Sequence, residues 1–308
     1  MNPQVSVIIP TKSRFELLRK SVTSADTQKA VSLEIIVVND GGVPITASSL
    51  GTEHSLQIVN LPESLGAPRA RNEGLKVARG KYIAFLDDDD TWCPNKLHSQ
   101  VKALKAHPEA VMVTSDYWIV GADGSRRIVQ VSKLGYSKQE LKFWNYVGGC
   151  SLPLLRREQV LSVGGFDPEL KSCQDWDLWF RLAKVSGDIL CVDVPSAEIL
   201  QHEGDRISNR RANRYHGWRL FVKKHRKEFS LPVRAYHQAR FFQSVLSDVA
   251  LVRTVTPFIG SAIHWMLGKV SGSRYRGMKI DECPESGRQQ GRCSRWTPTE
   301  FGTPKGTA

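Results

Sequence analysis

Four consecutive aspartates, Asp87 to Asp90, follow an apolar run at residues 82–86. Such a run is typical of a buried strand of a parallel sheet, and ligands bind beyond the carboxyl ends of these strands. Carboxylates crowded there repel one another and lose solvation, so a partner of opposite charge is expected. Mg²⁺ and Mn²⁺ prefer such oxygens. The run therefore indicates a metal site, with a solvated acidic loop as the alternative.

Two other strand ends are expected beside the aspartates. Residues 5–10 and 34–38 are short apolar runs, followed by the polar segment 11–14 and by Asp40. Because parallel strands end at the same edge of a sheet, these polar groups should approach the aspartate run.

A segment that begins at Gly66 carries Arg69 and Arg71 and leads into a helix expected at residues 70–78. A glycine loop, guanidinium groups and a helix N-terminus can together cradle an anion. Neither the GxGxxG fingerprint nor a GxxxxGK[ST] phosphate loop is present. Ordinary surface charge is the alternative for both arginines.

Two more carboxylates, Asp175 and Asp177, stand at the start of a helix expected at residues 174–185. Asp175 is a candidate general base. An acidic residue also favours a helix start, which is the alternative for Asp177. His202 follows near the end of the part with strand patterns, and a single histidine is weak evidence of a site.

Strand and helix patterns alternate along most of the chain and predict an α/β fold with a mostly parallel, doubly wound sheet. Further strands are expected at residues 56–60, 110–115 and 189–194, with 197–200 continuing the last of these. Residues 117–131 resemble a hairpin. The remaining helices are expected at 15–25, 94–106, 139–146 and 157–163.

The net charge of +12 is unevenly distributed along the 308 residues. Residues 1–209 have a net charge of −1, and residues 210–308 a net charge of +13. A basic block of this kind suggests a polyanionic partner, either a membrane surface or a nucleic acid. We expect a catalytic domain over 1–209, a helical basic extension over 210–270 and a disordered tail over 271–308.

No apolar run approaches the roughly 20 residues that a membrane-spanning helix needs, and the N-terminus resembles no signal peptide. A cytoplasmic protein is therefore expected, with peripheral attachment to the inner face of the membrane as an option. The six cysteines show no CxxC pair and are expected to be free thiols.

The order of these motifs resembles glycosyltransferase family 2, which has the GT-A fold. The stretches that carry the resemblance are VSVIIPTKSR, EIIVVNDGG, GAPRARNEGLKVARGKYIAFLDDDDTW, GGFDPEL, QDWDLWFRL and QHEGDRIS. They cover residues 4–210, and the most specific part lies between Gly66 and Trp92.

The resemblance implies roles for residues of the donor site. Asp40 matches the aspartate that binds the nucleotide base, and Pro10, Thr11 and Arg14 line the same pocket. Arg71 lies in the donor-binding segment of the family. The nucleotide-sugar is expected to carry UDP, with dTDP and GDP as open alternatives.

The resemblance also implies a metal and a base. Asp87 and Asp89 match the two ends of the DxD motif, and Asp88 fills its middle position. Asp89 would bind Mn²⁺ or Mg²⁺, with His202 as a late ligand of the metal or the diphosphate. Asp175 matches the catalytic base of an inverting enzyme that acts on a glycan or lipid-linked acceptor, as in the synthesis of bacterial surface polysaccharides.

The sequence departs from the family pattern at several positions. Gln174 replaces the usual glutamate before Asp175, and the second motif is NDGG instead of DDGS. Asp90 competes with Asp89 for the metal if the motif is shifted by one residue. Trp144, Asn145 and Cys150 are acceptor-side candidates only by their place in the chain.

Two other functions compete with this interpretation. A nucleotidyltransferase would also use a metal and paired carboxylates, but it would have a glycine- and lysine-rich N-terminal loop, which PTKSRFELL is not. A nucleic-acid-binding protein would use the basic block, in which Tyr215, Trp218 and Phe221 alternate with Arg and Lys. The acidic cluster makes nucleic acid an unexpected main partner.

Overall fold

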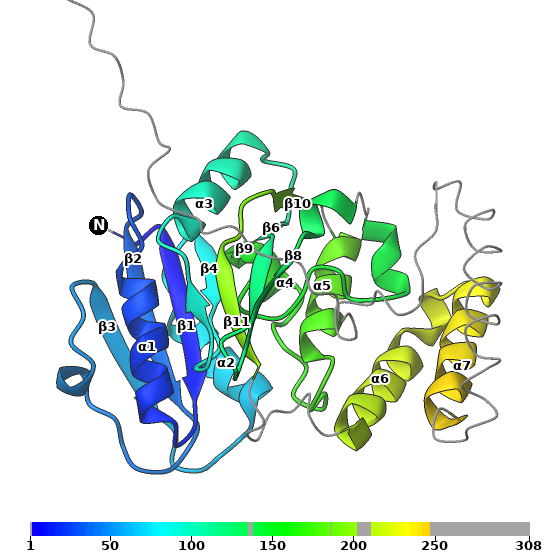
Figure 1. Ribbon diagram of the computed structural model, residues 1–308, viewed down its shortest axis with the longest axis horizontal. Coiled ribbons are helices and arrows are strands. Elements are labelled where there is room, and N and C mark those ends of the chain that lie inside the picture. The colour runs from blue at the N-terminus through cyan, green and yellow to red at the C-terminus, as the bar shows by residue number, and fades with distance from the viewer. Residues whose placement is uncertain (1, 135–137, 186, 202–210, 247–308) are drawn as a thin grey trace, which may run out of the picture. The chain divides into compact units, whose positions relative to one another are not determined.

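The computed structural model describes residues 2–134, 138–185, 187–201 and 211–246, and it has an α/β fold (Figure 1). The chain divides into two compact units, residues 1–238 and 239–308, and both sheets belong to the first. The first unit thus extends beyond residue 209, the expected end of the catalytic domain. No helix in the described ranges is long and apolar enough to cross a membrane.

The large sheet has seven strands in the order β10-β6-β9-β4-β1-β2-β3. All are parallel to one another except β9, which is antiparallel to both of its neighbours. The strands are β1 (Val5–Thr11), β2 (Leu33–Asn39), β3 (Ser55–Asn60), β4 (Tyr82–Phe85), β6 (Met112–Ser115), β9 (Leu154–Arg156) and β10 (Ile189–Val192).

A smaller sheet has the strand order β5-β11-β7-β8. Its strands are β5 (Thr91–Trp92), β7 (Tyr117–Gly121), β8 (Arg126–Val129) and β11 (Ala197–Gln201). The hairpin predicted at 117–131 is confirmed as β7 and β8. The prediction that 197–200 continues the strand at 189 is wrong, because β11 pairs with β5 and β7 in this second sheet.

Helices cover both faces of the large sheet, as the doubly wound pattern predicted (Figure 1). The helices are α1 (Phe15–Asp26), α2 (Ala67–Val77), α3 (Lys96–Ala106), α4 (Arg157–Ser162), α5 (Gln174–Val185), α6 (Arg211–His225) and α7 (Leu231–Leu246), with short 3₁₀ turns η1 (Ala47–Ser49), η2 (Val131–Leu134), η3 (Lys138–Lys142) and η5 (Arg226–Glu228). The stretch at 139–146, expected to be helical, forms only the short turn η3.

The alternation of side chains along β1 builds two apolar cores. Val7 and Ile9 point to the core that contains α1 and α3, while Ile8 points to the core that contains α2, α4 and α5. Gly74 lets α2 lie close to β1, because a Cβ there would stand 2.5 Å from Ile8 Cγ2. This packing fixes α2, and with it Arg71, against the sheet.

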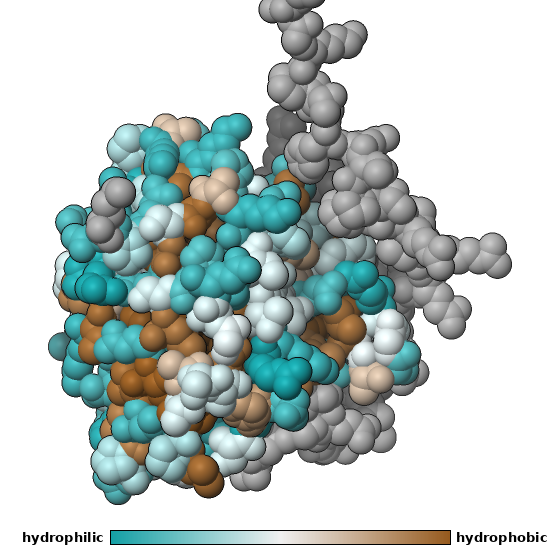
Figure 2. Space-filling view, turned by 90° about the vertical axis from the view of Figure 1, so that its left-hand side faces the viewer, coloured by the Kyte–Doolittle hydropathy of each residue, from teal (hydrophilic) through white to brown (hydrophobic). Residues whose placement is uncertain are grey.

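Strand β3 forms one edge of the large sheet, and β10 forms the other. The side chains of β3 are half-buried or exposed, and Figure 2, which looks onto the left-hand side of Figure 1, shows hydrophilic and hydrophobic surface there side by side. Interspersed polar groups of this kind are common on monomer surfaces and mark no site by themselves.

Helix α6 packs on α5 through aromatic side chains. Phe221 is fully buried and stacks on Trp176, with ring centroids 4.3 Å apart. Trp218 is half-buried and donates from Nε1 to His237 Nδ1 at 3.1 Å. Two of the three aromatics that suggested base stacking are therefore engaged within the protein, which weakens that support for nucleic-acid binding.

Glu34 ties the N-terminal strands together. Its buried carboxylate accepts hydrogen bonds from Ser6 Oγ at 2.6 Å and from the backbone N of Arg79 at 2.7 Å, and Arg79 Nη2 lies 2.8 Å away. Burial raises the pKa of Glu34, but the hydrogen bonds from Ser6 and Arg79 outweigh it, so the pKa lies below its usual value.

Glu34→Gln should lower the free energy of unfolding by about 1–3 kcal/mol at pH 7, because several donors lose a charged acceptor. A lowered pKa makes this stability fully present above the unfolded pKa of 4.5 and lost as the pH falls through the folded pKa. Urea unfolding at pH 7 and at pH 3 tests this, with the exposed Glu63→Gln as control. An equal deficit at both pH values would contradict it.

Candidate active site

The carboxyl ends of three neighbouring strands bring the expected site residues together. Strands β4, β1 and β2 are adjacent and parallel, so residues 87–90, Thr11 and Asp40 lie at one edge of the sheet. Thr11 donates from Oγ1 to Asp88 Oδ2 at 2.7 Å. Pro10 lies beside Val38 of β2 within the ladder. The predicted convergence of strand ends is thus observed.

The aspartates of the run differ in their surroundings. Asp87 is partly exposed, Asp88 is buried, and Asp89 lies 3.2 Å from Arg14 Nη1. Arg14 also lies 3.4 Å from Asp88. The run is therefore not a solvated acidic loop, because guanidinium and hydroxyl groups contact it from β1 and the segment that follows.

Asp90 fixes the backbone of the run. Its side chain is 3% exposed, accepts a hydrogen bond from Ser151 Oγ at 2.6 Å and lies 3.3 Å from the backbone N of Leu200. Ser151 Oγ also accepts from the backbone N of Asp87 at 3.1 Å. Asp90 thus has structural partners on both of its oxygens, which disfavours the shifted register in which it would bind the metal.

Crowding of the carboxylates has the electrostatic effect that the sequence suggested. Burial and, to a smaller extent, the charges of Asp89 and Asp87 raise the pKa of Asp88 to about 6, against the lowering effects of Thr11 and Arg14. Added positive charge at this edge would therefore favour the ionised form of Asp88.

Arg71 connects the aspartate run with α5. Its side chain is buried, donates from Nη2 to Asp87 Oδ1 at 2.6 Å and from Nη1 to Gln174 Oε1 at 3.0 Å, and lies over the ring of Phe166. The surface-charge alternative is thus wrong for Arg71, whereas the side chain of Arg69 is 51% exposed. The Nε of Arg71 is buried and meets no acceptor among the described residues.

Asp175 lies at the first turn of α5, near Arg71. Its Oδ1 accepts a hydrogen bond from the backbone N of Trp176 at 2.8 Å, and its Oδ2 accepts one from Asn145 Nδ2 at 3.2 Å. Burial raises the pKa of Asp175 to about 6, while the Trp176 N–H and Arg71 act in the opposite direction. A carboxylate with this pKa is ionised at neutral pH and suited to accept a proton.

Asp177 is more than a favourable helix-start residue. It is fully buried and bound by Arg181 at 2.7 Å, by Lys224 at 2.9 Å and by His225 Nε2 at 2.8 Å. Burial raises its pKa, but His225, Arg181 and Lys224 together lower it to about 2. Asp177 therefore anchors α6 to the helix that carries Asp175.

Asp40 holds the loop that leads into α2. Its carboxylate accepts hydrogen bonds from Ser64 Oγ at 2.9 Å and from the backbone N of Leu65 at 2.7 Å and of Gly66 at 3.0 Å. The backbone N of Gly66 also lies 3.2 Å from Oδ1, so each oxygen of Asp40 accepts two hydrogen bonds from this loop. His202, the other residue expected at the site, lies outside the described residues.

The described side chains supply only some of the oxygen ligands that a hard cation such as Mg²⁺ or Mn²⁺ needs. Within the described ranges, no three His, Cys, Asp or Glu side chains are grouped to hold a metal ion. Mg²⁺ and Mn²⁺ are commonly bound through one or two carboxylates, with substrate phosphates completing the shell. Asp89 offers such oxygens, one of which, Oδ2, lies 3.2 Å from Arg14 Nη1.

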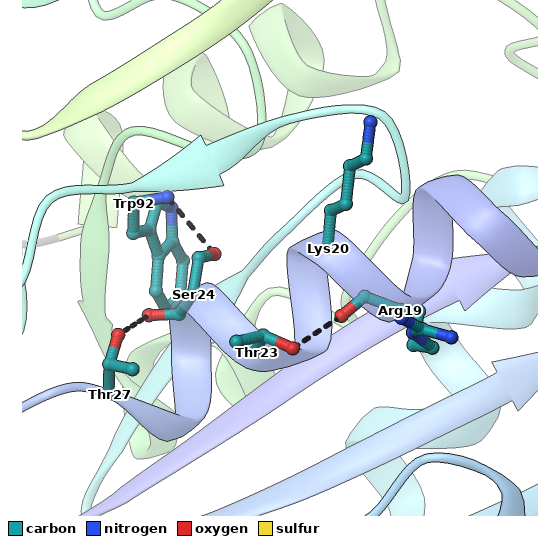
Figure 3. A pocket seen from close by; sticks show the side chains of 6 residues that line it. All are labelled: Arg19, Lys20, Thr23, Ser24, Thr27 and Trp92. Atoms are coloured by element: carbon teal, nitrogen blue, oxygen red, sulfur yellow. Dashed lines mark hydrogen bonds between the residues drawn. The ribbon is translucent and has the colours of Figure 1, made fainter.

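A surface hollow of about 340 Å³ lies elsewhere, between one face of α1 and Trp92 (Figure 3). Its hydroxyl groups bind the protein itself: Thr27 Oγ1 donates to Ser24 O, and Ser24 Oγ accepts from the backbone N of Trp92. None of the expected site residues lines it, so the strand edge remains the candidate active site.

The fold is that of a GT-A glycosyltransferase, and the sequence comparison identifies the family. The profile described as "Glycosyl transferase family 2" matches residues 6–161, about half of the chain. The chain belongs to glycosyltransferase family 2. The resemblance inferred from the motifs is confirmed.

Several relatives are named as glycosyltransferases. The chain is 32% identical over 193 residues to the glycosyltransferase RP339 of Rickettsia prowazekii. This alignment covers 60% of this chain and 60% of RP339. It is 31% identical over 219 residues to YwdF of Bacillus subtilis, covering 68% of this chain and 78% of YwdF. TuaG of B. subtilis, named for teichuronic acid biosynthesis, is 30% identical over 190 residues, with 59% of this chain and 73% of TuaG covered.

Solved structures share the fold at low sequence identity. Residues 1–349 of S. aureus TarS, in complex with UDP-GlcNAc, align with a TM-score of 0.62 at 19% identity, over 80% of this chain and 73% of that one. The mannosyltransferase PcManGT of Pyrobaculum calidifontis, in complex with GDP-Man and Mn²⁺, aligns with a TM-score of 0.58 at 17% identity. The alignment covers 89% of this chain and 76% of PcManGT. The predicted GT-A fold is thereby confirmed.

Proposed function

We propose that this protein is a metal-dependent, inverting glycosyltransferase that uses a nucleotide-diphosphate sugar. The observation that carries the proposal is the link through Arg71: one buried guanidinium binds Asp87 of the aspartate run and Gln174, the neighbour of Asp175. Donor-binding and proton-accepting groups are thereby held at a fixed separation, as a single displacement requires.

The donor would bind along the strand edge. Pro10, Thr11, Arg14 and Asp40 would surround the nucleotide, and Arg71, Asp87 and Asp88 would contact the sugar diphosphate. The buried Nε of Arg71 is a donor that an anionic group would satisfy.

The acceptor hydroxyl would give its proton to Asp175 while its oxygen attacks the anomeric carbon. The new C–O bond forms as the bond to the diphosphate oxygen breaks, which inverts the configuration at that carbon. Mn²⁺ or Mg²⁺ on Asp89, with His202 as a further ligand, would neutralise the charge of the leaving diphosphate. Asn145 would hold the Asp175 carboxylate in place.

The substrate class is narrowed by the relatives. TarS was solved in complex with UDP-GlcNAc and PcManGT in complex with GDP-Man and Mn²⁺, and TuaG is named for teichuronic acid biosynthesis. We take UDP as the nucleotide and a glycan or lipid-linked acceptor in surface polysaccharide synthesis. The chain covers only 60% of the length of RP339, so the activity of the whole protein belongs to this proposal.

Attachment to an anionic membrane surface is part of the same proposal. The C-terminal third holds the whole excess of positive charge, and Lys223, Arg226 and Lys227 are exposed near the end of α6. A basic residue near such a surface contributes roughly 1 kcal/mol to binding. The protein would then act on the cytoplasmic side, where nucleotide-sugars are available.

Calorimetric titration with UDP, GDP and dTDP, each with and without Mn²⁺, tests the donor site. Binding of one nucleotide that requires Mn²⁺ is expected, and it would identify the base. Failure of all three to bind in the presence of Mn²⁺ would overturn the proposed function.

A further inference from the structure

Arg71 has two hydrogen-bond partners of unequal charge. Asp87 Oδ1, at 2.6 Å, is anionic, whereas Gln174 Oε1, at 3.0 Å, belongs to a neutral amide. Gln174 is 8% exposed and Arg71 is 5% exposed. The amide orients the guanidinium without neutralising it.

Two charged groups from other parts of the chain act on Asp175, and an uncharged thiol lies near them. Arg71 of α2 contributes one positive charge, Asp87 after β4 one negative charge, and the buried Cys150 thiol faces the same group of side chains. With Asp175 ionised, these residues carry a net charge of −1. A glutamate at position 174 would make it −2 in a buried setting, where unbalanced charge is costly.

We propose that Gln174 is a positioning residue whose neutral amide fixes Arg71 while leaving the guanidinium charge to Asp87 and Asp175. This inference rests on the proposed function of Asp175 as the base. It explains why a neutral residue can stand before the base: the hydrogen bond to Arg71 Nη1 is kept, and a second anion beside Asp175 is avoided.

Gln174→Glu adds one negative charge with almost no change of shape. The apparent pKa of Asp175, followed by ¹³C NMR of aspartate carboxyl groups and assigned with Asp175→Asn, should rise by about one unit. The acid limb of the rate profile for sugar transfer should move upward by a similar amount. Gln57→Glu, at an exposed position of edge strand β3, adds the same charge away from the site and should leave both unchanged.

Gln174→Met separates the hydrogen bond from the charge. It removes the acceptor for Arg71 Nη1 without adding an anion, so the apparent affinity for the nucleotide-sugar should weaken while the NMR titration of Asp175 moves far less than in Gln174→Glu. Thermal unfolding of each variant confirms that it is folded at the pH values used.

An Asp175 titration in folded Gln174→Glu within about 0.2 units of the wild type would overturn the inference. The NMR experiment needs no substrate, so it is independent of the proposed function. If the titration shifts as expected but the wild type binds and transfers no nucleotide-sugar, the charge arrangement stands and the proposed function fails.

Discussion

Asp175→Asn should retain donor binding and lose turnover by about 10²–10⁴-fold. The amide has nearly the same shape and still presents an oxygen to the backbone N of Trp176, which lies 2.8 Å from the carboxylate. It cannot accept the proton of the acceptor hydroxyl. Calorimetry with the nucleotide-sugar and a steady-state assay of transfer separate the two effects.

A matched control for this variant is Asp123→Asn. Asp123 lies in the turn of the β7–β8 hairpin and is exposed, so the same chemical change there should leave turnover intact. If Asp175→Asn kept transfer within about tenfold of the wild type, another group would have to be the base.

Asp89→Ala should abolish Mn²⁺-dependent nucleotide binding and transfer without loss of the fold. Its side chain contacts Arg14 Nη1 at 3.2 Å, and the side chain of Arg14 is 36% exposed, so water can solvate the guanidinium when the carboxylate is removed. The removal of the carboxylate takes away the proposed metal ligand. Calorimetry with and without Mn²⁺, together with thermal unfolding, measures both quantities.

Asp90→Ala is the contrasting variant, because it tests the register of the motif. Loss of the acceptor for Ser151 Oγ, in a buried setting, should lower the free energy of unfolding by about 1–3 kcal/mol. If Asp90→Ala were stable but lost Mn²⁺-dependent binding, while Asp89→Ala kept it, the metal would belong to Asp90 and the assignment of the motif would be wrong.

The elements that the sequence predicted well have long or strongly apolar patterns. The helix expected at 174–185 has these bounds in the structure, and the runs at 5–10 and 34–38 are the buried strands β1 and β2. Their order along the chain also predicted that Thr11, Asp40 and the aspartates share one edge. This inference needed only the rule that parallel strands end together.

The elements that were missed are short or defined by distant partners. Strand β9 has three residues, which are too few to show a periodic pattern. Strand β11 was assigned to the wrong sheet, because the apolar pattern of a strand does not indicate which strands it pairs with. The hydrogen bonds from Ser151 to Asp90 and from Asn145 to Asp175 span 61 and 30 residues. Asn145 was an acceptor-side candidate only, and Ser151 was not predicted at all, since no local pattern indicates such contacts.

The two arginines of α2 show that burial, which the sequence pattern does not reveal, distinguishes a site residue from a surface residue. Arg69 and Arg71 are two residues apart on one helix, and ordinary surface charge was the alternative for both. The structure separates them, because α2 turns Arg71 toward β4 and α5 and leaves Arg69 half-exposed. Only the packing of α2 on the sheet, close at Gly74, determines which arginine meets the aspartates.

The buried contact of Asp177 with Lys224 and His225 couples the start of α5 to the end of α6 in folding. If α6 detached, Asp177 would keep Arg181 but lose two cationic partners, and Trp176 would lose the ring stacked on it. Local opening of either helix therefore disrupts the other, which makes them one cooperative unit. Backbone amides of the helix that bears Asp175 should then exchange with solvent at the rate set by the joint opening of α5 and α6.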